Sequence, residues 1–426
     1  MMSGIFATRY TKYGHGVDVR KTYASLPLQG FWTWVTGKSL NTAAPKPARD
    51  TLLSQPQLWL QVSWGYAVFL ASVIIGKMIL DADMHWAFKV LLSLPIFCLM
   101  INRSRGFLHT CHYTIHGAVL QSKKLSRFYY KWVLSIPVLH TPWDEYMQIH
   151  VVKHHGITTF STEQDVDQVY MTKHGFYCGM KESEFWLKLF LAPFHPARIY
   201  EHLKFRISVN FIVCSLNEKL SRTVYWLALT AVAYFCGYLE SFLLYYVGSI
   251  LIVTQFSSWV QHITEHQWFG INQHAWPRHV FYGSLTWGRF FGRPYPVDAK
   301  GWKFAVLLCK WSLAVLFIDI PLRVFAYMQD LPSHDFHHRV PAVGFWSIAP
   351  ERAAHEGRPS RYGPMTETWS MTEGILIARD HLCRGQSDPF DLEGWYRQNQ
   401  EHYKSLYEKK PRVVNARESE KEQCTA

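Results

Sequence analysis

Ten of the chain's 22 histidines fall into four short groups whose spacing suits metal binding. The groups are His112 and His116; His150, His154 and His155; His262 and His266; and His334, His337 and His338. Imidazole is the commonest metal ligand among side chains, and it suits iron, copper and zinc. Residues three or four apart on a helix share one face, so each group presents two or three ring nitrogens in one direction. Four such groups in one chain predict a shared metal site.

The choice of metal follows from the other residue types. Structural zinc takes four ligands and usually includes cysteine, but the eight cysteines here are scattered without zinc or redox-motif spacing, which predicts reduced thiols. A haem between helices or a metal transport path would place its ligands inside the apolar spans, and the histidine groups lie outside them. Nine or ten imidazoles suit two metal ions with four or five ligands each, and an all-nitrogen set favours iron.

The composition indicates a membrane protein with a sizeable part outside the lipid. Aromatic residues make up 16% of the 426 residues, and charged residues only 18%, against about 25% in soluble proteins. The net charge of +12 is spread through the loops, which favours contact with a membrane surface over nucleic acid. The basic, polar first 50 residues predict no cleavable signal peptide.

Four apolar stretches are long enough to cross a bilayer. The predicted spans are residues 58–80, 84–102, 223–240 and 242–260, paired as two hairpins, with the second pair hinged near Gly237–Glu240. Residues 183–216 and 302–325 are apolar but interrupted by charges, so they are expected to be amphipathic helices lying on the membrane.

These spans predict an all-α integral membrane protein with a helical cap that holds a histidine-rich dimetal site. The expected parts are an N-terminal segment 1–54, a membrane domain 55–345, and a C-terminal segment 346–426 that ends in a disordered tail. Nearly all Lys and Arg residues lie on the side of both termini, and the positive-inside rule places that side and the metal site in the cytoplasm. The second span is expected to continue as a helix towards Gly117 and the fourth past residue 260, which would carry two histidine pairs out of the lipid.

The order HxxxH, HxxxHH and HxxHH, with helical hairpins between and an extra histidine after the fourth span, resembles the membrane fatty acid desaturase and hydroxylase superfamily. The resemblance covers roughly residues 55–345. The spacings of the three boxes, and the run from Glu265 and His266 through two aromatic residues to Gly270, are similar to membrane alkane hydroxylases. The chain length and the run from His334 to Pro341 are similar to fatty acyl desaturases.

The resemblance implies a ligand set for two iron ions: His112, His116, His150, His154, His155, His266, His334, His337 and His338. His262 stands where acyl-CoA desaturases have an asparagine that reaches the metal through water, and it is a further candidate ligand. Ligating imidazoles usually give their second nitrogen to a carboxylate or carbonyl. The candidates for such support are His109, Asp165, Asp167, Glu265 and Asp335. Other histidines, including His174 and His381, are expected at the surface or the membrane interface.

The expected reaction is the O2-dependent desaturation of a fatty acyl chain by two Fe2+ ions. The alternatives with the same site are terminal hydroxylation of an alkyl chain and oxidative decarboxylation of a fatty acid to a 1-alkene; a more distant one is a non-catalytic membrane metal-binding protein. The substrate would be a free acid or an acyl group on a carrier protein, on CoA or in a lipid.

The electrons are expected from an external donor, a ferredoxin or rubredoxin with its reductase. Such donors are usually acidic. Basic residues around the first histidine group, Arg103, Arg105, Lys123, Lys124 and Arg127, are candidates for docking this donor or an acyl carrier protein.

Overall fold

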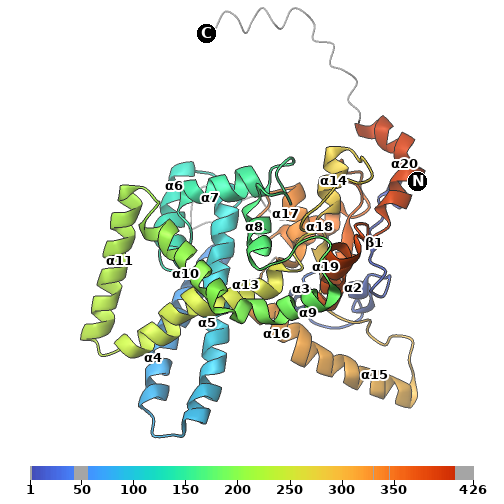
Figure 1. Cartoon of the computed structure of the whole chain (residues 1–426). Helices are drawn as coiled ribbons and strands as arrows, with labels where there is room; N and C mark the ends of the chain where they lie inside the picture. The colour runs from blue at the N-terminus through green and yellow to red at the C-terminus, as the bar shows by residue number, and fades with distance from the viewer. Residues whose placement is uncertain (1, 43–55, 330, 345, 408–426) are drawn as a thin grey trace, which may run out of the picture. The chain divides into compact units, whose positions relative to one another are not determined.

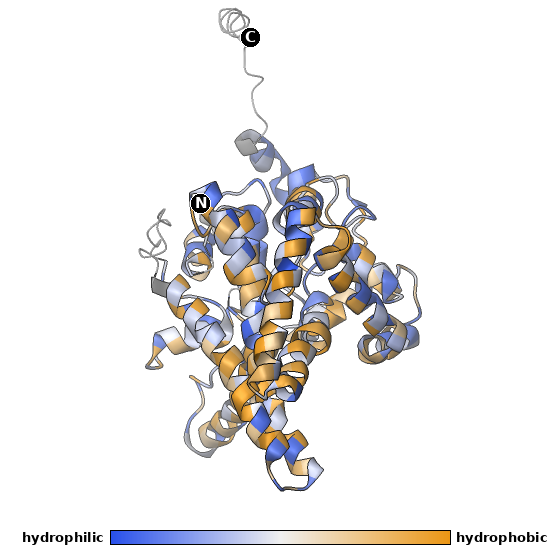
Figure 2. Cartoon of the chain, turned by 90° about the vertical axis from the view of Figure 1, so that its left-hand side faces the viewer, coloured by the Kyte–Doolittle hydropathy of each residue, from blue (hydrophilic) through white to orange (hydrophobic). Residues whose placement is uncertain are grey.

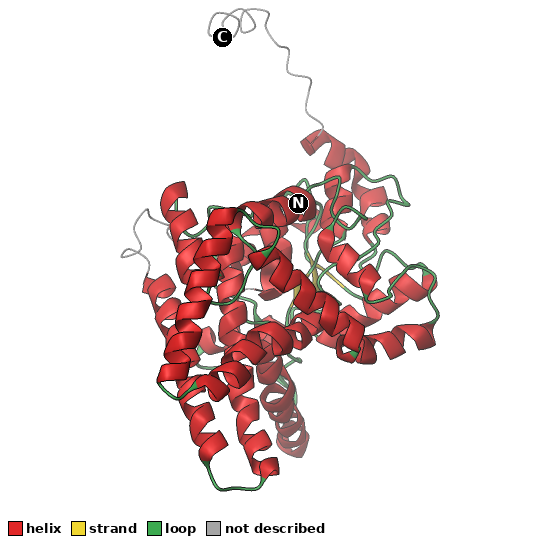
Figure 3. Cartoon of the chain, turned by 60° about the vertical axis from the view of Figure 1, so that its left-hand side comes forward, coloured by secondary structure: helices red, strands yellow, loops and turns green. Residues whose placement is uncertain are grey.

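Helices form almost all of the regular structure in the described part of the chain, with three very short strands beside them (Figure 3). The computed structural model describes residues 2–42, 56–329, 331–344 and 346–407. Residues Met1–Phe390 form one unit. The second unit, Asp391–Ala426, contains helix α20 (Leu392–Tyr407), and the predicted disordered tail lies from residue 408 onward outside the described residues.

Four helical stretches are long and apolar enough to cross a membrane. They are Leu58–Asp81 in α4 (Pro56–Asp81), Trp86–Ile115, which is α5, Leu239–His262, and Gly301–Phe325. In the last stretch only 11% of the most apolar window is buried within the protein, so lipid must cover the rest. Figure 2 shows hydrophobic residues concentrated on these helices. The chain is therefore an all-α, multi-pass membrane protein, as predicted.

Two of the stretches are built from several shorter helical segments. Leu239–His262 joins α12 (Leu239–Ser241), the π-helical segments Phe242–Val247 and Ser249–Val253, and α13 (Thr254–His262). Gly301–Phe325 joins α15 (Gly301–Ala314), the π-helical segment Val315–Asp319 and α16 (Ile320–Phe325).

The fourth candidate span differs from the sequence-based expectation. Residues 302–325 were expected on the membrane surface because of their charges, but Asp319 pairs with Arg293, and Arg323 donates to the carbonyls of Trp34 and Gln329. The predicted span 223–240 instead corresponds to α11 (Leu216–Phe235), which has three charged residues in its first two turns and is not among the four candidates. The predicted hinge is present, since Gly237 turns the chain with a φ of +76°.

The first two membrane helices pack as an antiparallel pair (Figure 1). A Cβ atom on Gly65 of α4 would lie 2.3 Å from the Phe107 ring of α5, and one on Gly76 would lie 2.1 Å from the Tyr245 ring. Gly65 therefore allows α4 to approach α5 closely, and Gly76 allows it to approach the stretch Leu239–His262, which contains Tyr245. The packing against α4 fixes the position of α5, a helix of 30 residues that ends at the first histidine group.

The other described helices of the unit Met1–Phe390 form its helical cap. Most of them are short: α1 (Met2–Ile5), α2 (Val19–Thr22), α3 (Gln29–Thr36), α6 (Lys123–Phe128), the π-helix Tyr129–Ser135, α7 (Trp143–Tyr146), the π-helix Met147–His154, α8 (Val166–Lys173), α9 (Glu182–Leu191), the 3-10 turn Ala192–Phe194, α10 (Pro196–Phe211), α14 (Arg278–Ser284), the 3-10 turn Leu331–Ser333, α17 (His334–Arg339), α18 (Ile348–His355) and α19 (Met371–Arg384).

A small parallel sheet ties the N-terminal segment to this cap. Its strands, in the order β1 (Arg9–Tyr10), β3 (Thr366–Thr368) and β2 (Gly288–Arg289), pair with Arg9 opposite Thr366 and Gly288 opposite Glu367. The strand residues of β2 and β3 are fully enclosed.

A buried ion network surrounds the sheet. Lys38 pairs with Asp18, Glu356 and Glu367, and Arg352 pairs with Glu367 and with Asp335 on α17. The N-terminal segment is thereby connected, through charged contacts, to α17, the helix that carries the fourth histidine group.

Candidate metal centre

Each histidine group occupies the end of a helix or the turn after it. His112 lies in the last turn of α5 and His116 caps that helix. His150, His154 and the capping His155 belong to the π-helix Met147–His154, and His334, His337 and His338 to α17. His266 follows α13 and pairs with Thr286 in an isolated antiparallel bridge. The groups therefore converge from four separate segments, as the sequence predicted.

Nine histidines form two sets, each able to hold one metal ion. The first set is His112, His116, His150, His155 and His337; the second is His154, His266, His334 and His338. Within each set the available ring nitrogens all lie within 4.8 Å of one another. The two sets adjoin, because the rings of His155 and His338 stack with centroids 4.3 Å apart. The nine residues are the nine expected from the resemblance, divided five and four.

The division follows helix geometry. A π-helix bonds residue i to i+5, so His155 comes onto the face of His150 and their Nε2 atoms lie 3.1 Å apart. His154, four residues after His150, falls into the other set. In α17, by contrast, the ordinary i,i+4 spacing joins His334 to His338, with Nε2 atoms 3.2 Å apart. The expectation that the whole second group points one way is therefore wrong for His154.

The nitrogen atoms fit metal ions well. The Nε2 atoms of His112 and His337 lie 2.7 Å apart, and those of His116 and His266 are buried without a hydrogen-bond partner in the described structure. Buried polar atoms normally have partners, and closely gathered lone pairs repel unless a cation lies between them. A metal ion in each set would take up these lone pairs.

The histidines outside the candidate spans are held in the neutral form that a metal needs. Burial, followed by the charge of His154, lowers the pKa of His116 to about 3. Burial likewise lowers the pKa of His334 to about 3, despite the opposing charge of Glu265. The pKa values of His150, His155, His266, His337 and His338 are also well below the usual range. Neutral imidazoles keep their lone pairs available to metal.

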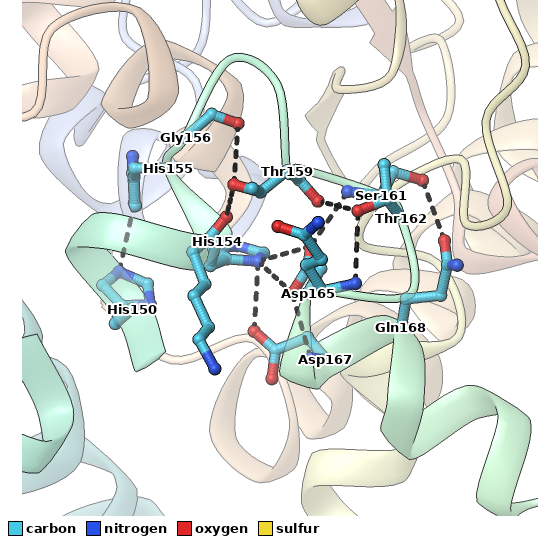
Figure 4. A network of polar contacts seen from close by, with 12 residues as sticks. His150, His154, His155, Gly156, Thr159, Ser161, Thr162, Asp165, Asp167 and Gln168 are labelled. Atoms are coloured by element: carbon cyan, nitrogen blue, oxygen red, sulfur yellow. Dashed lines mark hydrogen bonds and ion pairs between the residues drawn. The ribbon is translucent and has the colours of Figure 1, made fainter. Parts of the chain in front are cut away.

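His154 is the exception, and two carboxylates explain it. Burial alone would lower its pKa, but Asp165 and Asp167 outweigh that effect and raise the pKa to about 9. Its Nδ1 lies 3.1 Å from both oxygens of Asp165 and 3.2 Å from Asp167 (Figure 4). A proton on Nδ1 directed at Asp165 leaves Nε2 for a metal, which is the usual carboxylate–histidine–metal arrangement.

The loop after the second group holds Asp165 in place. Its carboxylate accepts hydrogen bonds from the backbone amides of Ser161 and Asp167, each at 3.0 Å. The Ser161 hydroxyl in turn donates to the carbonyl of Gln267, at 2.7 Å. This arrangement links the loop to the segment that carries His266 (Figure 4 shows the loop side).

Glu265 supports the second set from the other side. Its Oε1 lies 3.3 Å from His334 Nε2, accepts from Gln261 Nε2 at 2.7 Å, and is 3.4 Å from Arg289. Burial would raise the pKa of Glu265, but the charges of His334 and Arg289 outweigh it and lower the pKa to about 2. The carboxylate is therefore ionised beside the metal set.

The remaining candidates lie around the two sets without entering them. His262 donates from Nε2 to the carbonyl of Asp167 at 2.9 Å and stacks on Trp268, so it lies outside both sets. His109 is next to His112, with ring centroids 5.8 Å apart. Asp335, expected to support a histidine, instead accepts hydrogen bonds from Arg352.

One supporting residue was missed by the sequence analysis. The hydroxyl of Tyr282, on α14, lies 2.8 Å from His338 Nδ1 and is buried. It takes the place that a carboxylate was expected to fill. Because Tyr282 is 56 positions before His338 in a segment of ordinary composition, only the folded structure shows it.

Two further expectations are wrong. Arg105, proposed for docking, is buried and donates to Ser257 and to the carbonyl of Ala326, because α5 turns that side inward. His174 and His381 were expected at a surface, yet both are buried. The His174 ring stacks on the Trp259 ring. An uncharged imidazole can pack against an aromatic ring in an apolar core in this way.

These features define a class: a membrane protein with two adjoining histidine sets beside its membrane helices. Comparison with protein families agrees. Residues 84–297, half of the chain, match the model of the fatty acid desaturase family, and a comparison with curated proteins finds no match. The chain belongs to the fatty acid desaturase family, a family of membrane di-iron oxidoreductases. The matched segment ends before His334, so it is the fold that brings the fourth histidine group to the other histidines.

Proposed function

We propose that this protein desaturates a fatty acyl chain in an O2-dependent reaction with two iron ions in the histidine sets. The observation that carries the proposal is the nine histidines in two adjoining sets, seven of them buried, within a chain of the desaturase family. Such a centre, when loaded, supplies with O2 the oxidising power to break an unactivated C–H bond, which no acid, base or nucleophile of a protein can do.

The chain's own residues hold and shield this centre. Neutral imidazoles bind without adding charge, Asp165 and Tyr282 orient His154 and His338, and Glu265 lies against His334. Burial of the histidines excludes bulk water, which protects a reactive oxidant from side reactions. The position at the end of α5 suits an amphiphilic substrate whose tail lies in the protein and whose head remains near the membrane surface.

The proposed orientation places the histidine sets and both termini in the cytoplasm. The basic balance of the non-spanning segments supports it. Electrons would then come from a cytoplasmic carrier of the ferredoxin or rubredoxin kind.

The decisive experiment is mass spectrometry of lipids and headspace from a host that expresses the protein. A new double bond at unchanged carbon number is expected; it should be absent with His337→Ala and present with the control His15→Ala, which alters an exposed histidine. An added oxygen would instead assign a hydroxylase, and an alkene one carbon shorter a decarboxylase. Iron bound without any oxidised product and without O2 consumption would indicate a metal-binding protein and overturn the proposal.

A further inference from the structure

Desaturation with O2 requires more electrons than the substrate supplies, so an external donor must provide the rest. Reducing O2 to two water molecules takes four electrons and four protons. Converting a C–C single bond to a double bond supplies two of each. The other two electrons must come one at a time from a reduced carrier, with two protons from solvent. The carrier must approach the histidine sets closely, because electron tunnelling weakens steeply with distance.

One surface pocket reaches α17, the helix that carries the fourth histidine group. It has a volume of about 120 Å³ and is lined by Phe336, Arg339, His355, Arg358, Arg361 and Tyr362, among others. Phe336 lies between the ligands His334 and His337, and its ring is 4.9 Å from the ring of His355 at the rim. The floor of this pocket is therefore α17 itself.

A second connection runs through two tyrosines. The rings of Tyr362 and Tyr282 have centroids 5.9 Å apart, and the Tyr282 hydroxyl lies 2.8 Å from His338 Nδ1. Tyr362 is partly exposed, whereas Tyr282 and His338 are buried. Two aromatic rings and one hydrogen bond thus join the protein surface to a residue of the second histidine set.

The rim of the pocket is basic. The guanidinium groups of Arg361 and Arg339 lie 4.9 and 5.9 Å from the centre of the Tyr362 ring, and Arg358 and Arg361 are exposed. The nearest acidic residue along the chain, Glu356, is engaged by Arg352 and Lys38. Exposed positive charge around an aromatic ring suits an acidic protein partner.

From these contacts we infer that the surface around Tyr362, formed by Arg339, His355, Arg358, Arg361 and Tyr362, docks an acidic iron–sulfur protein that delivers electrons through Tyr362 and Tyr282 to His338. The inference rests on the proposed function, since it assigns the donor's place on the same centre. It moves the docking surface from the expected region around Lys123 and Lys124 to the loop between α18 and β3.

The test compares three double charge reversals in the full-length, iron-loaded protein in phosphatidylcholine nanodiscs. The first, Arg358→Glu with Arg361→Glu, alters the proposed surface. The second, Lys123→Glu with Lys124→Glu, alters the competing surface on α6. The third, Lys173→Glu with Lys181→Glu, is a matched control at exposed lysines. The probe is a reduced, acidic [2Fe–2S] ferredoxin, and the readouts are its Kd and the rate at which it is oxidised in stopped flow.

We expect the Arg358/Arg361 variant alone to bind ferredoxin about tenfold more weakly at low salt, with the difference shrinking as salt screens the charges. Tyr362→Leu should slow ferredoxin oxidation at saturating donor while its Kd stays close to that of the wild type. Equal losses in all three variants, a loss in the Lys123/Lys124 variant alone, or no loss at all would overturn the assignment.

Two further readouts distinguish this inference from lipid binding by the same surface and from failure of the proposed reaction. If charge reversal changes behaviour only in discs that contain phosphatidylglycerol and leaves ferredoxin affinity intact, the surface binds lipid headgroups and the inference fails. The Kd for ferredoxin is measured without acyl substrate, so it does not depend on the reaction. If the protein makes a desaturated product but the Arg358/Arg361 variant binds ferredoxin as tightly as the wild type, only the docking surface is rejected. The expected binding losses without any desaturated product would reject the reaction alone.

Discussion

At the residue scale, the candidate metal centre depends on the atoms behind the histidines as much as on the histidines themselves. Asp165, Glu265 and Tyr282 each contact a different histidine, and all three contacts lie in the second set. Such supporting groups orient the ring and select the nitrogen that carries the proton. Replacing them should weaken metal binding without removing a ligand.

Asp165→Asn should lower iron affinity about 10- to 100-fold, because an amide cannot accept from His154 and from both backbone amides as a carboxylate does. Asp167→Asn should cost less, since Asp167 is 39% exposed and makes a single contact with His154. Iron content measured by elemental analysis during chelator titration would compare them. A larger loss for Asp167→Asn would contradict the assigned roles.

The buried neutral imidazoles also make stability depend on pH. His116 and His334 have a pKa of about 3 when folded and about 6.5 when unfolded, so the unfolded chain binds more protons between these values. Metal-free protein should therefore lose stability as pH falls from about 6.5 towards about 3. Glu356 and Glu373 act oppositely, because burial raises the pKa of each to about 7, but the lowered histidines outnumber them.

Thermal unfolding of the metal-free protein in detergent, followed from pH 7 down to pH 5, measures this effect. The melting temperature should fall throughout that range. A melting temperature that is constant or rises on acidification would show that the histidines are solvated in the metal-free state.

At the element scale, the packing of α4 against α5 decides where the first histidine group stands. The approach of the two helices depends on Gly65, which faces the Phe107 ring of α5 five residues before His112. Helices in lipid gain little from the hydrophobic effect between them, so close van der Waals contact at small residues carries their association.

Gly65→Ala should destabilise the protein by about 1–3 kcal/mol, because its added methyl group would meet Phe107 at 2.3 Å. The matched control is Gly30→Ala in helix α3, where a Cβ meets nothing within 4 Å and alanine should be neutral or stabilising. Retention of iron after mild heating would report both changes. Equal behaviour of the two variants would mean that α4 and α5 separate easily.

At the scale of the whole unit Met1–Phe390, buried charges join segments that are distant in sequence. Lys38 is 3% exposed in its side chain and pairs with Asp18 and Glu367. Arg352, which also pairs with Glu367, extends the network to Asp335, beside the histidines of α17. Removing one partner of such a network leaves an uncompensated buried charge.

Lys38→Met should therefore destabilise this unit by about 3–5 kcal/mol, and it should release iron at a lower temperature than the wild type. Lys12→Met is the control, because Lys12 is 57% exposed and a surface ion pair contributes little. Both variants can be compared by thermal unfolding with metal analysis. Unchanged iron retention in Lys38→Met would show that α17 is held independently of the N-terminal segment.

The proposed orientation can be measured directly. After the exposed Cys178, Cys236 and Cys309 are changed to serine, Asp83→Cys, between α4 and α5, should react with a membrane-impermeant maleimide added to intact cells. Lys123→Cys should react only after permeabilisation, because it lies beyond the far end of α5. The reverse labelling would place the histidine sets outside the cytoplasm.

The sequence alone determined the nine histidines, the helical class and three of the four candidate spans, because these depend on local properties: residue type, short spacing and apolar length. The matched family segment even ends before His334, yet the spacing of that group was already informative. Local patterns sufficed wherever neighbours in sequence are also neighbours in space.

Only the tertiary structure decided how those histidines divide and what supports them. A π-helix pairs His150 with His155 and sends His154 to the other set, although α-helical spacing predicts otherwise. Tyr282 reaches His338, and Asp335 turns to Arg352, through contacts between segments far apart in the chain. The charged residues in 301–325 also have partners that the local sequence does not show. Arg293 pairs with Asp319 only in the folded chain, and this stretch is one of the four candidate spans.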